Sequence, residues 1–517
     1  MRELQEFVSL IKSGKVTWPE KINPFETGKE EKINVLFNGP MEGQFATDKE
    51  AMILLYGSDG ADTRGKYKVL KARLKERLVS LVHYTNKEVY VTGTYKGEFM
   101  SCHEDYIMGR MLYFHGTHLA GRRFIMKALK HAAEYEVYEI AKLCVAVLRK
   151  ADVSKGDPLI MDEHTRQINE YHEKETAELK AEEIYYNLLL PFANKLYIEP
   201  GSHKISEVAL SEVEKIIKEC PTFLIANIYH HIKIINHQLN NNIENAISAC
   251  DEGIAALKNN TKMYSDARMG IFLLRKIDCI MLLNPGNHLT VLAEESKKLF
   301  QQGTINWYRA QELYFLMGLM PSNLLLSSSI NAYRESILHP KFQTLEISIQ
   351  EQWHIYGGYL WFALTYYASG TSPTNRDLVF GKRSGYDFGK LYNNTRAAAK
   401  DKKGMYISYL VLQNLIYIQE KNYRALEKTT TSLKNHLSAY IHADNNRVRT
   451  YMRLLMAFIE SKGKFNKNAT LIKKLKVELE KTEYSKTAAQ VQIEVIPYTL
   501  QWQMIEEMVM ESKLTVS

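Results

Sequence analysis

The chain has few of the residues that interrupt helices or cross-link a small secreted fold. Its 517 residues include only 12 prolines and five cysteines. Because proline ends or kinks a helix, so low a proline content favours long helices. The cysteines are odd in number and far apart in the sequence, so they predict neither a disulfide framework nor a paired zinc site. We therefore expect reduced thiols and a cytoplasmic location.

Long apolar runs are also missing. The longest, over residues 313–326, is interrupted by Pro321, Ser322 and Asn323, and it is too short to span a bilayer. Residues 1–6 lack the basic-then-apolar pattern of a signal peptide. We therefore expect no membrane partner and no export.

The sequence lacks the short motifs that identify common enzyme sites. It has no glycine-rich phosphate loop, no G-x-S-x-G nucleophile turn and no H-E-x-x-H pair. Its densest glycine cluster, residues 57–60, is not followed by Lys-Ser or Lys-Thr and predicts a turn. We expect no enzyme activity and no cofactor.

Histidines offer the best alternative to that expectation. His115 and His118 lie one helical turn apart, and a metal-dependent hydrolase built on them is a third hypothesis. A zinc site needs three or four converging ligands, and no third one has a fixed spacing to this pair. The adjacent His230 and His231 would point about 100° apart on a helix, so they do not chelate together. We therefore predict no metal site.

What the sequence does contain is a helical rhythm. From about residue 222 the apolar residues fall into helix-sized blocks with short Asn, Gly or Pro punctuation; the first four are spaced by about 41 residues, and a later pair shows a similar interval. The segments between the blocks are amphipathic and predict return helices, so the unit is a helical hairpin. The blocks begin near residues 222, 264, 305, 345, 403 and 445. The return helices cover residues 243–257, 289–302 and 324–338.

One return helix carries a family resemblance. Its large and small residues lie at the offsets that tetratricopeptide repeats use, and residues 421–426 are a second, weaker example. Residues 492–502 also look like the closing segment of uncharacterised bacterial repeat proteins. The resemblance implies a tetratricopeptide-like solenoid over about the last 300 residues, and it implies no activity. The residues that carry it are Ile243, Ala246, Cys250 and Gly253.

The fold class that we predict is mainly α: a helical-hairpin solenoid with a small N-terminal α+β or winged-helix-like module. That module would hold helices over residues 48–55 and 67–82 and a hairpin over residues 89–97. A long helix is expected over residues 159–195. The expected divisions are a loop-rich segment (1–44), the small module (45–103), a helical region (104–202), a repeat array (203–370), an insertion or linker (371–402) and C-terminal repeats with a cap (403–517).

Three regions are candidates for binding. Lys68, Lys71 and Lys75 lie on the basic second helix of the module and would contact nucleic-acid phosphates, although a solvated helix surface is the preferred interpretation because side chains suited to base reading are lacking. The insertion is basic at residues 381–385 and is either a spacer or a binding loop. Aromatic residues dense in the array fill the core by default, or line a groove for a peptide. These are Trp307, Tyr308, Trp353, Tyr356 and Trp361.

The net charge decides little between partners, since 67 basic residues face 59 acidic ones and the formal charge is +8. Our first hypothesis is a non-enzymatic scaffold that binds a protein or peptide through the helical repeats. The alternative is a transcriptional regulator in which the N-terminal module binds DNA and the repeats form a sensor.

Overall fold

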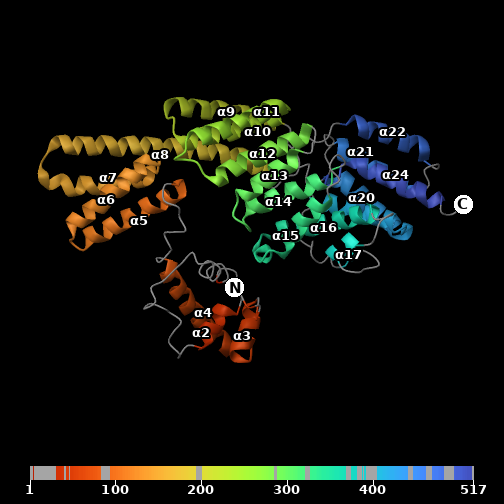
Figure 1. The fold of residues 1–517 in the computed structure, drawn as a ribbon, viewed down its shortest axis with the longest axis horizontal. Helices are drawn as coiled ribbons and strands as arrows, with labels where there is room; N and C mark the ends of the chain where they lie inside the picture. Colours follow the sequence, from red (N-terminus) through yellow and green to blue (C-terminus); the bar gives the residue numbers. More distant parts are fainter. Residues whose placement is uncertain are drawn as a thin grey trace. The chain divides into compact units, whose positions relative to one another are not determined.

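The computed structural model describes an all-helical chain in the part that it covers (Figure 1). The chain divides into two compact units, Met1–Glu104 and Asp105–Ser517. The residues described are 4, 31–39, 42, 44, 45, 47–82, 94–193, 201–283, 288–320, 326–367, 374–380, 387, 389, 391, 405–440, 446–461, 468–482 and 494–514.

In the described part of the first unit, helices α2 (Glu31–Asn38), α3 (Asp48–Tyr56) and α4 (Ala61–Val82) share a core of their own. A capping box begins α3, because the Thr47 hydroxyl accepts from the Glu50 amide and the Glu50 carboxylate accepts from the Thr47 amide. The helix α2 lies in the segment that we predicted to be rich in loops.

The winged-helix prediction is not supported, because the described residues contain no strand. Helix α5 (Tyr95–Phe114) begins inside the predicted hairpin, so Tyr95–Gly97 are helical, while residues 89–93 lie outside the described part. The chain is helical here because of a helix cap at Thr94, which the alternating pattern did not predict. The Thr94 hydroxyl accepts a hydrogen bond from the Gly97 amide at 3.2 Å, which favours a helix start at this point.

The second unit opens with a group of long helices: α6 (His118–Glu134), α7 (Tyr138–Asp152), the short 3-10 helix η4 (Val153–Lys155) and α8 (Pro158–Ala193). Glycines bring α5 and α6 close together. A Cβ atom on Gly109 would lie 2.7 Å from the Ile125 side chain, and one on Gly121 would lie 2.9 Å from the Tyr113 ring. The 36-residue α8 agrees with the long helix that the sequence predicts.

Hairpins of consecutive helices follow, and each helix packs against its neighbours in the chain, as in a helical repeat. Long helices begin within two residues of the positions predicted near 222, 264, 305 and 345. The elements are α9 (Ser202–Glu219), α10 (Phe223–Leu239), α11 (Ile243–Asn259), α12 (Asp266–Leu283), α13 (His288–Lys298), α14 (Ile305–Gly318), α15 (Leu326–Leu338), η5 (Phe342–Thr344) and α16 (Ile347–Tyr367).

Close packing of α11 on α12 depends on a small residue. Gly253 faces Phe272, and a Cβ atom at this position would lie 2.4 Å from the ring. Ile243, Ala246 and Cys250 are buried on the same helix. The sequence pattern therefore identified the buried face of this helix correctly.

The C-terminal helices share one large core with the array. Helix α17 falls inside the predicted insertion and packs against α16. Helix α24 contacts both α22 and α19, so it returns to a helix that precedes it by almost a hundred residues. These elements are α17 (Thr374–Phe380), α19 (Met405–Gln419), α20 (Tyr423–Tyr440), α21 (Asn446–Glu460), α22 (Ala469–Lys481) and α24 (Tyr498–Leu514).

Candidate functional site

The five aromatic residues proposed for a groove lie in the core. None of their side chains is more than 3% exposed. They pack in edge-on or stacked pairs with other rings, as Phe315 does on Tyr356 at a centroid distance of 5.0 Å. This is the core-filling interpretation of the sequence. In this structure the side chains offer no surface to a partner, and binding elsewhere on the array stays a prediction. The five are Trp307, Tyr308, Trp353, Tyr356 and Trp361.

The three lysines proposed for nucleic-acid contact have different environments. Lys68 is exposed, and Lys75 is half-buried. The Lys71 ammonium donates to Asp48 at 2.6 Å, and the Tyr67 hydroxyl donates to the same carboxylate at 2.6 Å. Burial raises the pKa of Asp48, but these two hydrogen bonds outweigh it and lower the pKa to about 2. Lys71 thus holds α4 to α3, and phosphate contact by the other two stays a prediction.

A row of polar side chains connects α8, α12, α14 and α16. The Arg275 guanidinium on α12 donates to the Tyr185 hydroxyl on α8 at 3.1 Å. One turn further along α12, Asp278 accepts from Arg309 on α14 at 2.8 Å. Arg309 also donates to Glu312 at 2.6 Å.

Helix α16 completes this row. Glu312 accepts from the Tyr356 hydroxyl at 2.6 Å and from the Gln352 amide at 2.5 Å. We call the whole set the polar row. It consists of Tyr185, Arg275, Asp278, Arg309, Glu312, Gln352 and Tyr356.

The spacing along each helix explains why the row is continuous. Arg275 and Asp278 are three residues apart on α12, as are Arg309 and Glu312 on α14, so each pair shares one helix face. The row is only partly covered: the Arg309 side chain is 21% exposed. Glu312 and Tyr356 are buried, so within the described part of the array only the other, half-buried members of the row reach the surface.

Electrostatics keep the row charged but balanced. Burial raises the pKa of Asp278, although Arg309 opposes this effect. Burial alone would lower the pKa of Arg309, but the carboxylates of Asp278 and Glu312 raise it. Burial, and then Glu312, raises the pKa of Tyr356 well above its ordinary value, so its hydroxyl remains a donor. Two arginines balance two carboxylates. This arrangement suits holding a polar chain better than activating a nucleophile.

The histidines singled out in the sequence do not converge. His115 and His118 are exposed at the turn between α5 and α6. His231 is buried and stacks on Phe272 at a centroid distance of 4.3 Å, and burial lowers its pKa well below the ordinary value. His230, beside it, is half-buried. Among the described residues, no three His, Cys, Asp or Glu side chains are placed to hold a metal ion.

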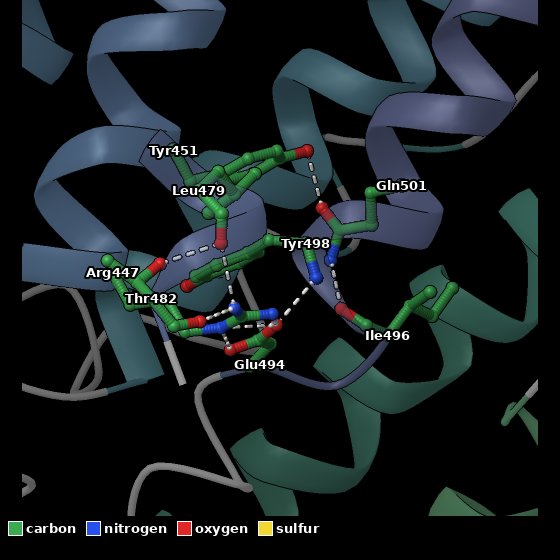
Figure 2. Close-up of polar contacts among 8 residues, drawn as sticks. All are labelled: Arg447, Tyr451, Leu479, Thr482, Glu494, Ile496, Tyr498 and Gln501. Atoms are coloured by element: carbon green, nitrogen blue, oxygen red, sulfur yellow. Dashed lines mark hydrogen bonds and ion pairs between the residues drawn. The ribbon is translucent and has the colours of Figure 1, made fainter. Parts of the chain in front are cut away.

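A second polar cluster lies deep in the C-terminal part, and Figure 2 shows it. The Arg447 guanidinium on α21 donates to both oxygens of Glu494, the shortest contact being 2.8 Å. Arg447 also donates to the backbone oxygens of Leu479 and Thr482 at the end of α22. Glu494 accepts from the Tyr498 amide, the first of α24, at 2.6 Å.

This cluster joins three helix ends. A carboxylate at the start of α24 and a cation at the end of α22 both oppose the partial charges of those helix termini. Tyr451 stacks on Tyr498 at 4.1 Å and donates to Gln501 at 2.7 Å (Figure 2). The ion pair and the first residue of α24 are buried. The cluster therefore stabilises the packing of α21, α22 and α24 and has no open face for a ligand among the described residues.

Sequence reasoning identified neither polar cluster. The partners are 47 residues apart for Arg447 and Glu494 and 90 residues apart for Tyr185 and Arg275. In the sequence each pair is only an arginine and a polar residue on separate helices, with no spacing that connects them. The signal that the sequence does contain is weaker. Residues of opposite charge lie three positions apart on α12 and again on α14.

Comparison with protein-family models, curated proteins and solved structures finds no significant match for this chain. No described helix has the length and apolarity needed to cross a membrane.

Proposed function

We propose that this chain is a non-enzymatic scaffold that binds a protein or peptide through the polar row of its helical array. The observation that supports the proposal most is the alignment of half-buried polar side chains on α8, α12, α14 and α16, which are Tyr185, Arg275, Arg309 and Gln352. A bound chain in an extended conformation has free backbone N–H and C=O groups, and such a row can satisfy them. Side chains held by neighbouring ion pairs lose little further entropy on binding.

The test uses two adjacent residues on α12. Arg275 contacts Tyr185 in the row, whereas Lys276 pairs with Asp251 of α11 at 2.6 Å and lies outside the row. We expect tagged full-length protein to capture a partner that survives nuclease treatment, Arg275→Ala to lose it, and Lys276→Ala to retain it. Quantitative mass spectrometry of the captured proteins measures this. Equal capture by both variants would show that the partner does not bind at the polar row.

The DNA-binding alternative has its own test. Reversing the charge of Lys68 and Lys75 leaves the Lys71–Asp48 contact intact, so the variant should fold. Steeply salt-dependent DNA binding by the wild type that this variant loses would favour the regulator. Absence of such binding, together with a nuclease-resistant partner, would favour the scaffold.

A further inference from the structure

Two interhelical turns lie side by side at one end of the first helices of the second unit. Arg122, near the start of α6, donates to both oxygens of Asp152 at the end of α7, at 2.7 and 3.1 Å. The same carboxylate contacts Lys155 at 2.7 Å and His164 on α8 at 3.2 Å. Asp152 is buried, so this cluster fixes the α5–α6 turn beside the α7–α8 turn. We call the two turns the hairpin end.

The hairpin end exposes large apolar side chains. Phe114 ends α5 and is 88% exposed, and Leu119, at the start of α6, is 90% exposed. On the other turn Val153 is 63% and Leu159 is 78% exposed. Single exposed apolar residues are common, but four on two adjoining turns form a patch of the kind that marks an interaction site.

The patch has positive charge beside it. Residues 106–133 contain five Lys and Arg residues and no aspartate or glutamate, and two of the five are paired, Arg122 with Asp152 and Lys127 with Asp105. Arg110 lies one helical turn before Phe114, and Arg123 lies one turn after Leu119, so each shares a helix face with an exposed apolar side chain. Both arginines are exposed, and neither forms an ion pair with a described residue.

The carboxylates at the hairpin end are mostly engaged. Asp152 is buried and contacts Arg122, Lys155 and His164, and Asp157 accepts from the Leu159 amide at 3.0 Å. Glu163 pairs with Arg166 at 2.8 Å. Asp162 is exposed on the first turns of α8, so the positive potential is strongest on the α5–α6 side.

We propose that the hairpin end docks on the surface of an anionic lipid bilayer. Phe114 and Leu119 would enter the headgroup region, with Arg110 and Arg123 against the lipid phosphates. Stable attachment to a membrane surface needs both apolar insertion and basic charge, and this end supplies both. The apolar side chains protrude from turns, a convex shape that suits a soft bilayer. The sequence-based expectation of no membrane partner rested on the lack of spanning segments, which such docking does not need.

The experiment is cosedimentation of the full-length protein with vesicles. One set contains equal parts of phosphatidylglycerol and phosphatidylcholine, and the other contains phosphatidylcholine alone. We expect binding to the first set that weakens as salt is added, and little binding to the second. Failure to bind the anionic vesicles, or equal binding to both sets, would overturn the proposal.

Variants separate the two contributions. Arg110→Ala with Arg123→Ala should weaken binding about 25-fold, since each basic residue near an anionic surface contributes roughly fivefold. Phe114→Ser with Leu119→Ser should reduce binding at every salt concentration. The matched control is Leu338→Ser, because Leu338 is equally apolar and 69% exposed but lies on α15. Circular dichroism checks that each variant folds. Unchanged vesicle binding by both double variants would contradict the proposal, and the outcome is independent of the polar row.

Discussion

At the scale of single residues, burial has shifted the protonation of His436 on α20. Its side chain is buried, with the ring edge-on to Tyr406 at a centroid distance of 5.3 Å. Burial lowers its pKa to about 4, because the charged imidazolium is poorly solvated there. The folded protein therefore holds this histidine neutral at pH values where the unfolded chain is protonated.

This shift predicts a loss of stability in acid. Between pH 6.5 and 4 the unfolded state binds a proton that the folded state does not, so the free energy of unfolding falls as the pH is lowered through this window. We expect His436→Gln to remove roughly 1–2 kcal/mol of the loss between pH 7 and pH 5. Urea unfolding of both proteins at the two pH values measures it. Identical pH dependence in the two proteins would show that His436 is not the group responsible.

At the scale of helices, the buried pair of Arg447 and Glu494 decides whether α21, α22 and α24 stay together. Glu494→Gln would leave a buried guanidinium without its counter-charge, and we expect a cost of about 3–5 kcal/mol in the free energy of unfolding. Denaturant titration of the C-terminal transition measures it. The control is Glu507→Gln on α24, an exposed carboxylate that accepts hydrogen bonds from Tyr366 and Gln503, and we expect it to cost only about 1 kcal/mol.

A double replacement sharpens this prediction. Arg447→Met with Glu494→Leu removes both charges, so it should recover most of the stability that Glu494→Gln loses. If the double variant were as unstable as the single one, the hydrogen bonds of Arg447 to the end of α22 would matter more than the ion pair.

Individual helices were largely predictable from the sequence, and their partners were not. Thr222 and Thr304 mark helix starts because their hydroxyls cap the following amides, and both lie next to apolar blocks. Periodicity gives the length and apolar face of a helix. It does not say which distant helix covers that face, so the contact of Tyr185 with Arg275 has no signal in the local pattern. The predicted hairpin is wrong over residues 95–97, because a cap at Thr94 starts a helix there.

At the scale of the whole molecule, the division into two compact units predicts two unfolding transitions. Leu74 is fully buried in the first unit and Leu455 in the second. Each Leu→Ala replacement should cost about 2–5 kcal/mol in its own unit. Scanning calorimetry should therefore show Leu74→Ala lowering one transition temperature and Leu455→Ala lowering the other. A single transition that both variants shift together would mean that the units unfold as one.

The return of α24 onto α19 has a consequence for biosynthesis. Helix α19 begins at Met405 and α24 at Tyr498, so about 90 residues separate them. At ordinary rates of translation a ribosome needs on the order of 5–20 s to add these residues. During that interval the face of α19 that α24 will cover is exposed on the nascent chain. Synonymous codon changes that slow translation between the two helices should therefore increase the time for which this face can bind a chaperone or aggregate.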